Sequence, residues 1–387
     1  MAQALVFFRQ AHMTPLLALI LFGSAAASHG QKPDCSGRQC SSPTRGKSLL
    51  QVLHRAADEG SKPAEEAELL TWETVHVNET APAVAQERRL PACHASKQTG
   101  GCLPSFMVIG VQKSATSTLF NLLATHPQVH PPTRKELFFF NGNFQGLHCD
   151  PPESIPSDDE FAKYLALFPR LNRSSNAITG EFTATYMHCW CCPRAMQRLL
   201  PDLRLITQLR DPIERARSRY QEQHDWAKKM ETYQTFEEYV DRELPSLEQC
   251  LKVANSLEGE VRCATQSNIL GLSLYDSALR LWFKHFHPAD LLVTYLDHLA
   301  ADPQAVFSAV HSHLGLRNLH YSQELLHKKY NHAGNYGWGE AMLQLGNNSG
   351  LQKLYHFYRP HLQQLKRLAD QGLITQLPVA WVKRWSL

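Results

Sequence analysis

The stretch "VIGVQKSATSTLFNLLATHP", residues 108–127, joins two kinds of secondary structure. Its first residues are typical of a buried strand, and the apolar residues that follow have helical spacing up to Pro127. The junction itself is polar and consists of Lys113, Ser114, Thr116, Ser117 and Thr118 around Ala115. Because a helix N-terminus presents unpaired N–H groups and the positive end of a dipole, this junction favours a bound anion. The alternative is an ordinary helix cap by Ser114 or Thr116 beside an exposed lysine.

The junction does not match the P-loop of nucleoside triphosphatases. That motif, G-x-x-x-x-G-K-[ST], has a second glycine directly before the lysine. Here Gly110 is followed by Lys113 three residues later, and Ala115 comes after the lysine. The residue types still suit a phosphate site, since a loop of small residues can direct N–H groups at an anion that a lysine and hydroxyls also bind.

A second strand-to-helix junction lies in "LITQLRDPIERARSRYQEQ", residues 205–223. Asp211 is a suitable N-cap and Pro212 a suitable first-turn residue for a helix that contains Ser218. Arg210 is then at the strand tip, and with Ser218 it forms a plausible second phosphate site. The alternative is a solvated basic face, in which Arg215, Arg217 and Arg219 pair with Glu214 and Glu222.

The fold class follows from strands that alternate with helices. Continuous apolar runs at 105–111, 203–209 and 290–296 are typical of strands buried on both faces, and 277–286 and 351–369 have helical patterns. This order predicts an α/β fold with a central, mainly parallel sheet flanked by helices. Ligands of such sheets bind beyond the carboxyl ends of the strands, where both polar junctions are expected.

The rest of the chain indicates a secreted or luminal protein. No charged residue lies between Arg9 and Lys32, so residues 1–27 are predicted to be a secretory signal that is either cleaved or retained as an anchor. Residues 28–102 have the composition of a stem, and residues 103–387 form the folded domain. The net charge of +3 is too small to indicate a nucleic-acid-binding protein.

The ten cysteines suit an oxidising compartment, as do glycosylation sequons at Asn78, Asn172 and Asn347. In the "CWCC" stretch, residues 189–192, disulfides are favoured over a metal site, because no partner pair at zinc-finger spacing follows. Cys250 and Cys263 are predicted to pair and to close a polar loop between them.

Taken together, the two junctions resemble the nucleotide-binding elements of the sulfotransferases, which use 3'-phosphoadenosine 5'-phosphosulfate (PAPS). Residues 110–129 resemble the 5'-phosphosulfate loop of that family, and residues 209–221 resemble its 3'-phosphate element. The similarity continues through residues 270–316 and ends at 354–368. The signal and stem favour the Golgi carbohydrate enzymes. The branch most similar is the heparan and galactosaminoglycan O-sulfotransferases, in particular the type that adds a 6-O-sulfate to N-acetylgalactosamine 4-sulfate.

The resemblance implies roles for individual residues. Lys113 is expected to contact the 5'-phosphate and the bridging oxygen, with the loop and helix start binding the same group. Arg210 and Ser218 are expected to hold the 3'-phosphate, and Tyr275, in "GLSLYDS", to line the nucleotide side. The loop and helix-start residues are Ser114, Ala115, Thr116, Ser117 and Thr118.

The expected catalytic base is Glu136. The stretch "HPPTRKELFFFNG", residues 130–142, resembles the family's "KE…FF" stretch, whose glutamate accepts the proton of the acceptor hydroxyl. Without the resemblance, Glu136 would be assigned to a surface ion pair with Lys135 or Arg134. The alternative bases are His126 and His130.

One departure concerns the acceptor. "GEFTATYM", residues 180–187, resembles the heparan enzymes' "GEKSPAYF", but Phe182 replaces their lysine while Glu181 is retained. The departure argues against a heparan acceptor more than against catalysis, and the resemblance implies a galactosaminoglycan acceptor of the chondroitin or dermatan type. A polyanionic acceptor would be attracted by basic residues outside the nucleotide site, namely Arg134, Lys135, Arg217, Arg219, Lys228 and Lys229.

The expected function is therefore transfer of a sulfuryl group from PAPS to a sugar hydroxyl in the Golgi lumen or after secretion. No metal and no nucleic acid are expected, and a membrane is a partner only if the N-terminal segment is an anchor. The alternatives are a luminal P-loop kinase and a glycan-binding protein whose transferase site has decayed.

Overall fold

The computed structural model describes residues 102–141, 149, 154–171, 176–223, 235–328 and 349–387. The predicted signal, almost all of the stem, the three sequons, Lys228 and Lys229 lie outside the described residues. Within those ranges, no helix combines the length and apolar character needed to cross a membrane.

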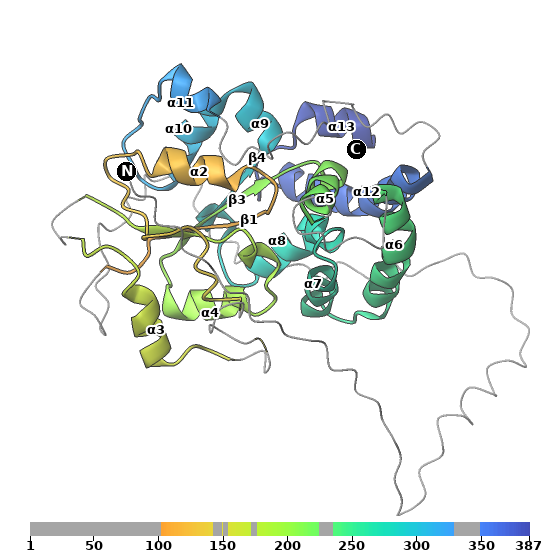
Figure 1. Ribbon diagram of the computed structural model, residues 1–387, viewed down its shortest axis with the longest axis horizontal. Coiled ribbons are helices and arrows are strands. Elements are labelled where there is room, and N and C mark those ends of the chain that lie inside the picture. The colour runs from red at the N-terminus through yellow and green to blue at the C-terminus, as the bar shows by residue number, and fades with distance from the viewer. Residues whose placement is uncertain (1–101, 142–148, 150–153, 172–175, 224–234, 329–348) are drawn as a thin grey trace, which may run out of the picture. The chain divides into compact units, whose positions relative to one another are not determined.

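Four parallel strands form the central sheet in the order β2-β1-β3-β4, and Figure 1 labels β1, β3 and β4. They are β1 (Phe106–Gly110), β2 (Gly180–Phe182), β3 (Arg204–Leu209) and β4 (Leu291–Tyr295). The predicted strands at β1, β3 and β4 are confirmed, and so is the parallel sheet. Strand β2 was not predicted, because a three-residue strand is too short to show a period.

Helices cover both faces of the sheet, as the alternating side chains of its strands require. Phe106, Val108 and Ile206 belong to one core, and Met107 and Leu205 belong to the other. The first core is completed by α2 (Thr116–Leu123), α9 (Leu296–Ala301), α10 (Pro303–His313) and α11 (Gln323–His327). The second is completed by α3 (Asp158–Leu165), α4 (Cys192–Leu199), α5 (Pro212–Gln221), α6 (Phe236–Val253), α7 (Leu257–Gln266), α8 (Tyr275–Phe283), α12 (Ser349–Asp370) and α13 (Val379–Trp385).

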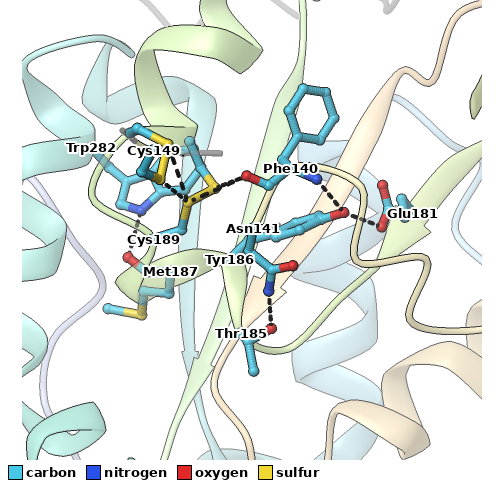
Figure 2. The surroundings of a disulfide bond; sticks show 11 residues. Phe140, Asn141, Cys149, Glu181, Thr185, Tyr186, Met187, Cys189 and Trp282 are labelled. Carbon is cyan, nitrogen blue, oxygen red and sulfur yellow. Dashed lines mark hydrogen bonds between the residues drawn. A yellow bond between two sulfur atoms is a disulfide. The ribbon is translucent and has the colours of Figure 1, made fainter. Parts of the chain in front are cut away.

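Three disulfides lie in the second core or against it. The predicted Cys250–Cys263 bridge is confirmed, but it joins α6 to α7, so the prediction of a loop between these cysteines was wrong. The "CWCC" stretch forms Cys189–Cys192 and Cys149–Cys191, so its sulfur atoms are engaged in disulfides as predicted (Figure 2).

An ion pair links the second-core helices α8 and α12. His361 Nδ1 lies 3.0 Å from Oδ1 of Asp276, whose side chain is buried. Burial acts to lower the pKa of His361, but the charge and hydrogen bond of Asp276 outweigh it and raise the pKa above its usual value. Since the folded-state pKa is raised, the pair stabilises the fold fully below the unfolded pKa, and this contribution is lost as pH rises through the folded pKa.

We therefore expect His361→Gln to lower the free energy of unfolding by about 1–2 kcal/mol in mildly acidic buffer. The loss should be smaller in alkaline buffer, because the contribution of the pair is lost as pH rises through the folded-state pKa of His361. Urea unfolding at both pH values measures the difference. His356→Gln, at an exposed position on the same helix, is the control. The same loss at both pH values would contradict the assignment.

Candidate active site

Neighbouring parallel strands bring the two polar junctions together. Because β1 and β3 pair in parallel, the segments that follow Gly110 and Leu209 leave the same edge of the sheet. The Arg210 guanidinium donates to the carbonyl oxygen of Lys113 over 3.2 Å, and the Gln208 amide donates to that of Ser114. The predicted convergence of the two junctions is confirmed.

The loop after β1 has an unusual backbone. A side chain at Gly110 would place its Cβ 2.9 Å from Met187 Cβ, so this position requires glycine. Lys113 and Ala115 have φ of 71° and 59°, in the left-handed region. Glu136 and Phe138, with φ of 62° and 56°, share this conformation, so two short segments contain four of the five non-glycine residues with positive φ in the described ranges. Such residues are concentrated at functional sites.

The start of α2 has no side-chain cap. Its N-cap residue is Ala115, so the alternative of a cap by Ser114 or Thr116 is wrong. The Thr118 N–H donates to the Ala115 carbonyl oxygen over 2.9 Å, whereas the earliest N–H groups of a helix have no intrahelical acceptors. The Ser114 hydroxyl is fully buried and has no hydrogen-bond partner in the described part of the chain. A bound anion would satisfy these groups.

The carboxylate of Glu222, the C-cap residue of α5, contacts this loop. Glu222 Oε1 is 3.1 Å from Lys113 Nζ, and Glu222 Oε2 accepts a hydrogen bond from Arg219. Burial acts to raise the pKa of Glu222, but Lys113 and Arg219 outweigh it and lower the pKa. Glu222 is therefore ionised at neutral pH. The pairing of Arg219 with Glu222 was one of the alternatives for this face, whereas the contact with Lys113 was not predicted.

The N-terminus of α5 is capped by Asp211 as predicted. Its carboxylate accepts from the N–H groups of Ile213 and Glu214, over 3.1 and 3.2 Å. Arg215 was expected on a solvated face, but it is fully buried, and its guanidinium donates to Ser273 and to the carbonyl oxygens of Asn268 and Ile269. Ser218 is half-buried on the same helix.

Residues near the C-terminal end of the described chain fix the N-terminus of α5. Arg384 Nη1 lies 3.0 Å from Asp211 Oδ2 and 3.0 Å from Glu214 Oε1, and the Trp385 indole donates to Asp211 over 2.9 Å. Glu214 in turn lies 3.7 Å from the Arg210 guanidinium. Burial raises the pKa of Asp211, and Arg384 opposes that shift. These contacts were not predicted from the sequence.

Tyr275 holds the backbone of Arg210. Its hydroxyl donates to the Arg210 carbonyl oxygen over 2.7 Å, and burial raises the pKa of Tyr275, so the hydroxyl stays protonated. The structure thus brings Tyr275 to the second junction.

The segment that contains Glu136 lies along the end of β2. The Glu136 N–H donates to the Phe182 carbonyl oxygen over 2.9 Å. Lys135 Nζ lies 3.2 Å from Glu136 Oε1 and donates to the hydroxyls of Thr116 and Ser117 over 3.2 and 3.0 Å. The ion pair of Glu136 with Lys135, the alternative to a catalytic role, is therefore present. Because Lys135 also contacts Thr116 and Ser117, this pair lies at the start of α2, next to the loop after β1.

Glu181, on β2, contacts the segment that follows Glu136 through the Tyr186 hydroxyl. It is fully buried and accepts hydrogen bonds from Tyr164, from Thr183 over 2.6 Å and from Tyr186 over 2.7 Å. Burial raises the pKa of Glu181, and the hydroxyl donors oppose that shift. Figure 2 shows the Tyr186 hydroxyl between Glu181 and the N–H of Phe140, which donates to it over 3.3 Å. Glu181 therefore connects β2, through Tyr186, to the backbone of Phe140.

Phe182 and the two histidines have other surroundings. Phe182 is buried, with edge-to-face contacts to Phe106 and Phe120. Both ring nitrogens of His126 are within hydrogen-bond distance of backbone groups, the Arg317 carbonyl oxygen at 2.9 Å and the Gln128 N–H at 3.1 Å. These contacts favour a structural histidine over a catalytic base. His130 is exposed.

Comparison with known proteins identifies the family. A family model described as "Sulfotransferase domain" matches residues 103–333, more than half of the chain. This chain belongs to the sulfotransferase family. The sheet and its flanking helices are therefore those of the P-loop-like sulfotransferase fold, and the resemblance to sulfotransferases is confirmed at that level.

Similar curated proteins include heparan sulfate enzymes. The sulfotransferase is 27% identical over 312 residues to human "Bifunctional heparan sulfate N-deacetylase/N-sulfotransferase 3", covering 75% of this chain and 32% of that protein. It is 27% identical over 237 residues to the bovine form 2, covering 60% of this chain and 24% of that protein. The chain thus spans about a third or less of the length of these relatives.

A sulfotransferase from Alicyclobacillus acidocaldarius is among the similar solved structures. It has 20% sequence identity and a TM-score of 0.49, and the match covers 72% of this chain and 99% of that chain.

The contacts of Arg384 give a testable prediction. Arg384→Met leaves the buried Asp211 carboxylate without its cation, so the free energy of unfolding should fall by about 1–3 kcal/mol. Lys383→Met, at the exposed neighbouring position, is the control and should change stability by less than about 0.5 kcal/mol. Urea unfolding of both variants measures the difference, and equal stabilities would show that Arg384 does not fix α5.

Proposed function

We propose that this sulfotransferase transfers a sulfuryl group from PAPS to a sugar hydroxyl of a glycan. The observation that supports the proposal most is the contact of Arg210 with the Lys113 carbonyl oxygen. It makes one site of two segments that each resemble a phosphate-binding element. Lys135 contacts both Thr116 and Glu136, so Glu136 also lies near this edge of the sheet.

The residues present fit such a donor. In this proposal Lys113 contacts the 5'-phosphate and the bridging oxygen, while residues 114–118 bind the same group. The buried Ser114 hydroxyl and the uncapped start of α2 are donors that suit this ligand. Arg210 and Ser218 hold the 3'-phosphate, and Tyr275 positions Arg210 through its carbonyl oxygen.

Catalysis in this proposal consists of proton removal and charge stabilisation. Glu136 accepts the proton of the attacking hydroxyl as the new S–O bond forms. Lys113 and the loop N–H groups stabilise the charge that grows on the departing phosphate oxygen. As in phosphoryl transfer, positioning and electrostatics provide most of the acceleration. No metal is required, because cationic side chains supply the positive charge.

We further propose a galactosaminoglycan acceptor of the chondroitin or dermatan type, with 6-O-sulfation of N-acetylgalactosamine 4-sulfate as the specific candidate. Phe182, which replaces a lysine of the heparan O-sulfotransferases, packs in the core and provides no charge to an acceptor. The heparan sulfate named for the curated relatives is the rival acceptor.

The proposed compartment is the Golgi lumen, with residues 1–27 as signal or anchor, residues 28–102 as stem and residues 103–387 as the transferase domain. The disulfides of the folded part support an oxidising compartment. Membership of the sulfotransferase family argues against the luminal kinase. A glycan-binding protein with a decayed site would bind neither PAPS nor adenosine 3',5'-bisphosphate.

Two substitutions separate the proposed roles. Glu136→Gln removes the base and should lower kcat at least about 100-fold, with the Kd for adenosine 3',5'-bisphosphate changed less than about threefold. Lys113→Ala should lower kcat and also weaken binding of the bisphosphate by about 10-fold or more. Calorimetry and single-turnover kinetics measure the two effects. Equal losses of nucleotide affinity would contradict the assignment of Glu136.

The acceptor is tested with radiolabelled PAPS and a panel of chondroitin, dermatan and heparan sulfate chains. We expect label on galactosaminoglycan chains and none with Lys113→Ala. Label confined to heparan sulfate would overturn the acceptor proposal while supporting the transferase. No label and no nucleotide binding would overturn both.

A further inference from the structure

Lys135 was predicted to lie outside the nucleotide site, but it contacts the start of α2 and Glu136. Its side chain is 19% exposed, and its ammonium contacts the hydroxyls of Thr116 and Ser117 together with the Glu136 carboxylate. The neighbouring Arg134 is exposed. The two adjacent cations therefore differ, since one is directed to the start of α2 and the other is at the surface.

The position of Lys135 is electrostatically unfavourable unless an anion is nearby. Thr116 and Ser117 are the first two residues of α2, where the helix dipole is positive. Lys113 adds a second ammonium in the preceding loop. Cations at a helix N-terminus repel the dipole by an amount comparable to what anions gain there.

The carboxylates near the start of α2 offset this repulsion only in part. Glu136 pairs with Lys135, and Glu222 pairs with both Lys113 and Arg219. The Ser114 hydroxyl remains buried without a partner in the described residues. The proposed mechanism also needs the Glu136 carboxylate to accept a proton from the acceptor, so Lys135 needs another anion during the reaction.

We propose that Lys135 is a catalytic residue that binds the sulfonate oxygens of the sulfuryl group during its transfer. This inference rests on the proposed function and names a residue that its mechanism does not include. A cation that touches both the donor-binding helix start and the base is suitably located to contact a group that moves from one to the other.

The step balances without a further reactant. The S–O bond to the donor phosphate breaks, and its electron pair stays on the phosphate oxygen of adenosine 3',5'-bisphosphate. A new S–O bond forms to the acceptor oxygen, whose proton goes to Glu136. Lys135 keeps its protons throughout and donates hydrogen bonds to the sulfonate oxygens, which lowers the barrier electrostatically.

The test compares nucleotides with and without the sulfuryl group. Lys135→Met keeps the length and apolar part of the side chain but removes its charge, and Arg134→Met is the matched control at the adjacent exposed position. We expect Lys135→Met to weaken PAPS at least about 10-fold more than adenosine 3',5'-bisphosphate in calorimetry. We expect kcat to fall about 100-fold, with the KM for the acceptor changed less than about threefold. Arg134→Met should change the ratio of the two nucleotide affinities less than about twofold.

Two further variants separate catalysis from structural support. Lys135→Gln retains hydrogen bonding to the hydroxyls without the charge and should lose kcat like Lys135→Met, while Lys135→Arg should recover most of it. Recovery by Lys135→Gln, equal weakening of both nucleotides, or unchanged kcat would overturn the role of Lys135 while leaving the transferase intact. If the wild-type protein binds neither nucleotide, the proposed function fails, and this inference fails with it.

Discussion

The parallel pairing of β1 with β3 is the constraint on which the site depends. It places the segments after Gly110 and Leu209 side by side at one edge of the sheet, although Lys113 and Arg210 are 97 residues apart in the chain. Two hydrogen bonds, from Gln208 and Arg210 to successive loop carbonyl oxygens, then fix the loop against β3. The side chains of Gln208 and Arg210 thus hold the loop backbone, while the Lys113 ammonium pairs with Glu222.

The cations of the site are held by carboxylates of the same chain. Glu222 pairs with Lys113, Glu214 with Arg210 and Glu136 with Lys135. These pairs keep long, flexible side chains near the positions that the proposed ligand requires, which reduces the entropy lost on binding. They also mean that binding exchanges ion pairs, so nucleotide affinity should depend on how readily Glu222 and Glu214 give up their partners.

Local patterns predicted the parts of the site that are local in the chain. The apolar runs, the polar junctions after them and the Asp211 cap are visible in short windows, because strand burial and helix capping involve neighbouring residues. Contacts between distant segments were not predictable in this way. Nothing in the sequence near Arg384 or Trp385 indicates Asp211, and nothing near Glu222 indicates Lys113. Arg215 was misassigned for the same reason, since its burial depends on acceptors at Asn268, Ile269 and Ser273.

The contact of α13 with α5 connects catalysis to the order in which the chain folds. Asp211 and Arg384 are separated by 173 residues, so the cap of α5 is complete only after a long loop has closed. Contacts between residues so far apart in the chain form slowly and depend on the rest of the domain. In a partly folded chain, the sheet could be formed while α13 is not yet packed on α5. Arg210 would then be at its strand end, but Asp211 and Glu214 would lack their contacts with Arg384. A ligand that binds only the docked form stabilises the whole domain through mass action. If the proposed nucleotide binds only the docked form, it would then favour folding of this chain as well as take part in the proposed reaction.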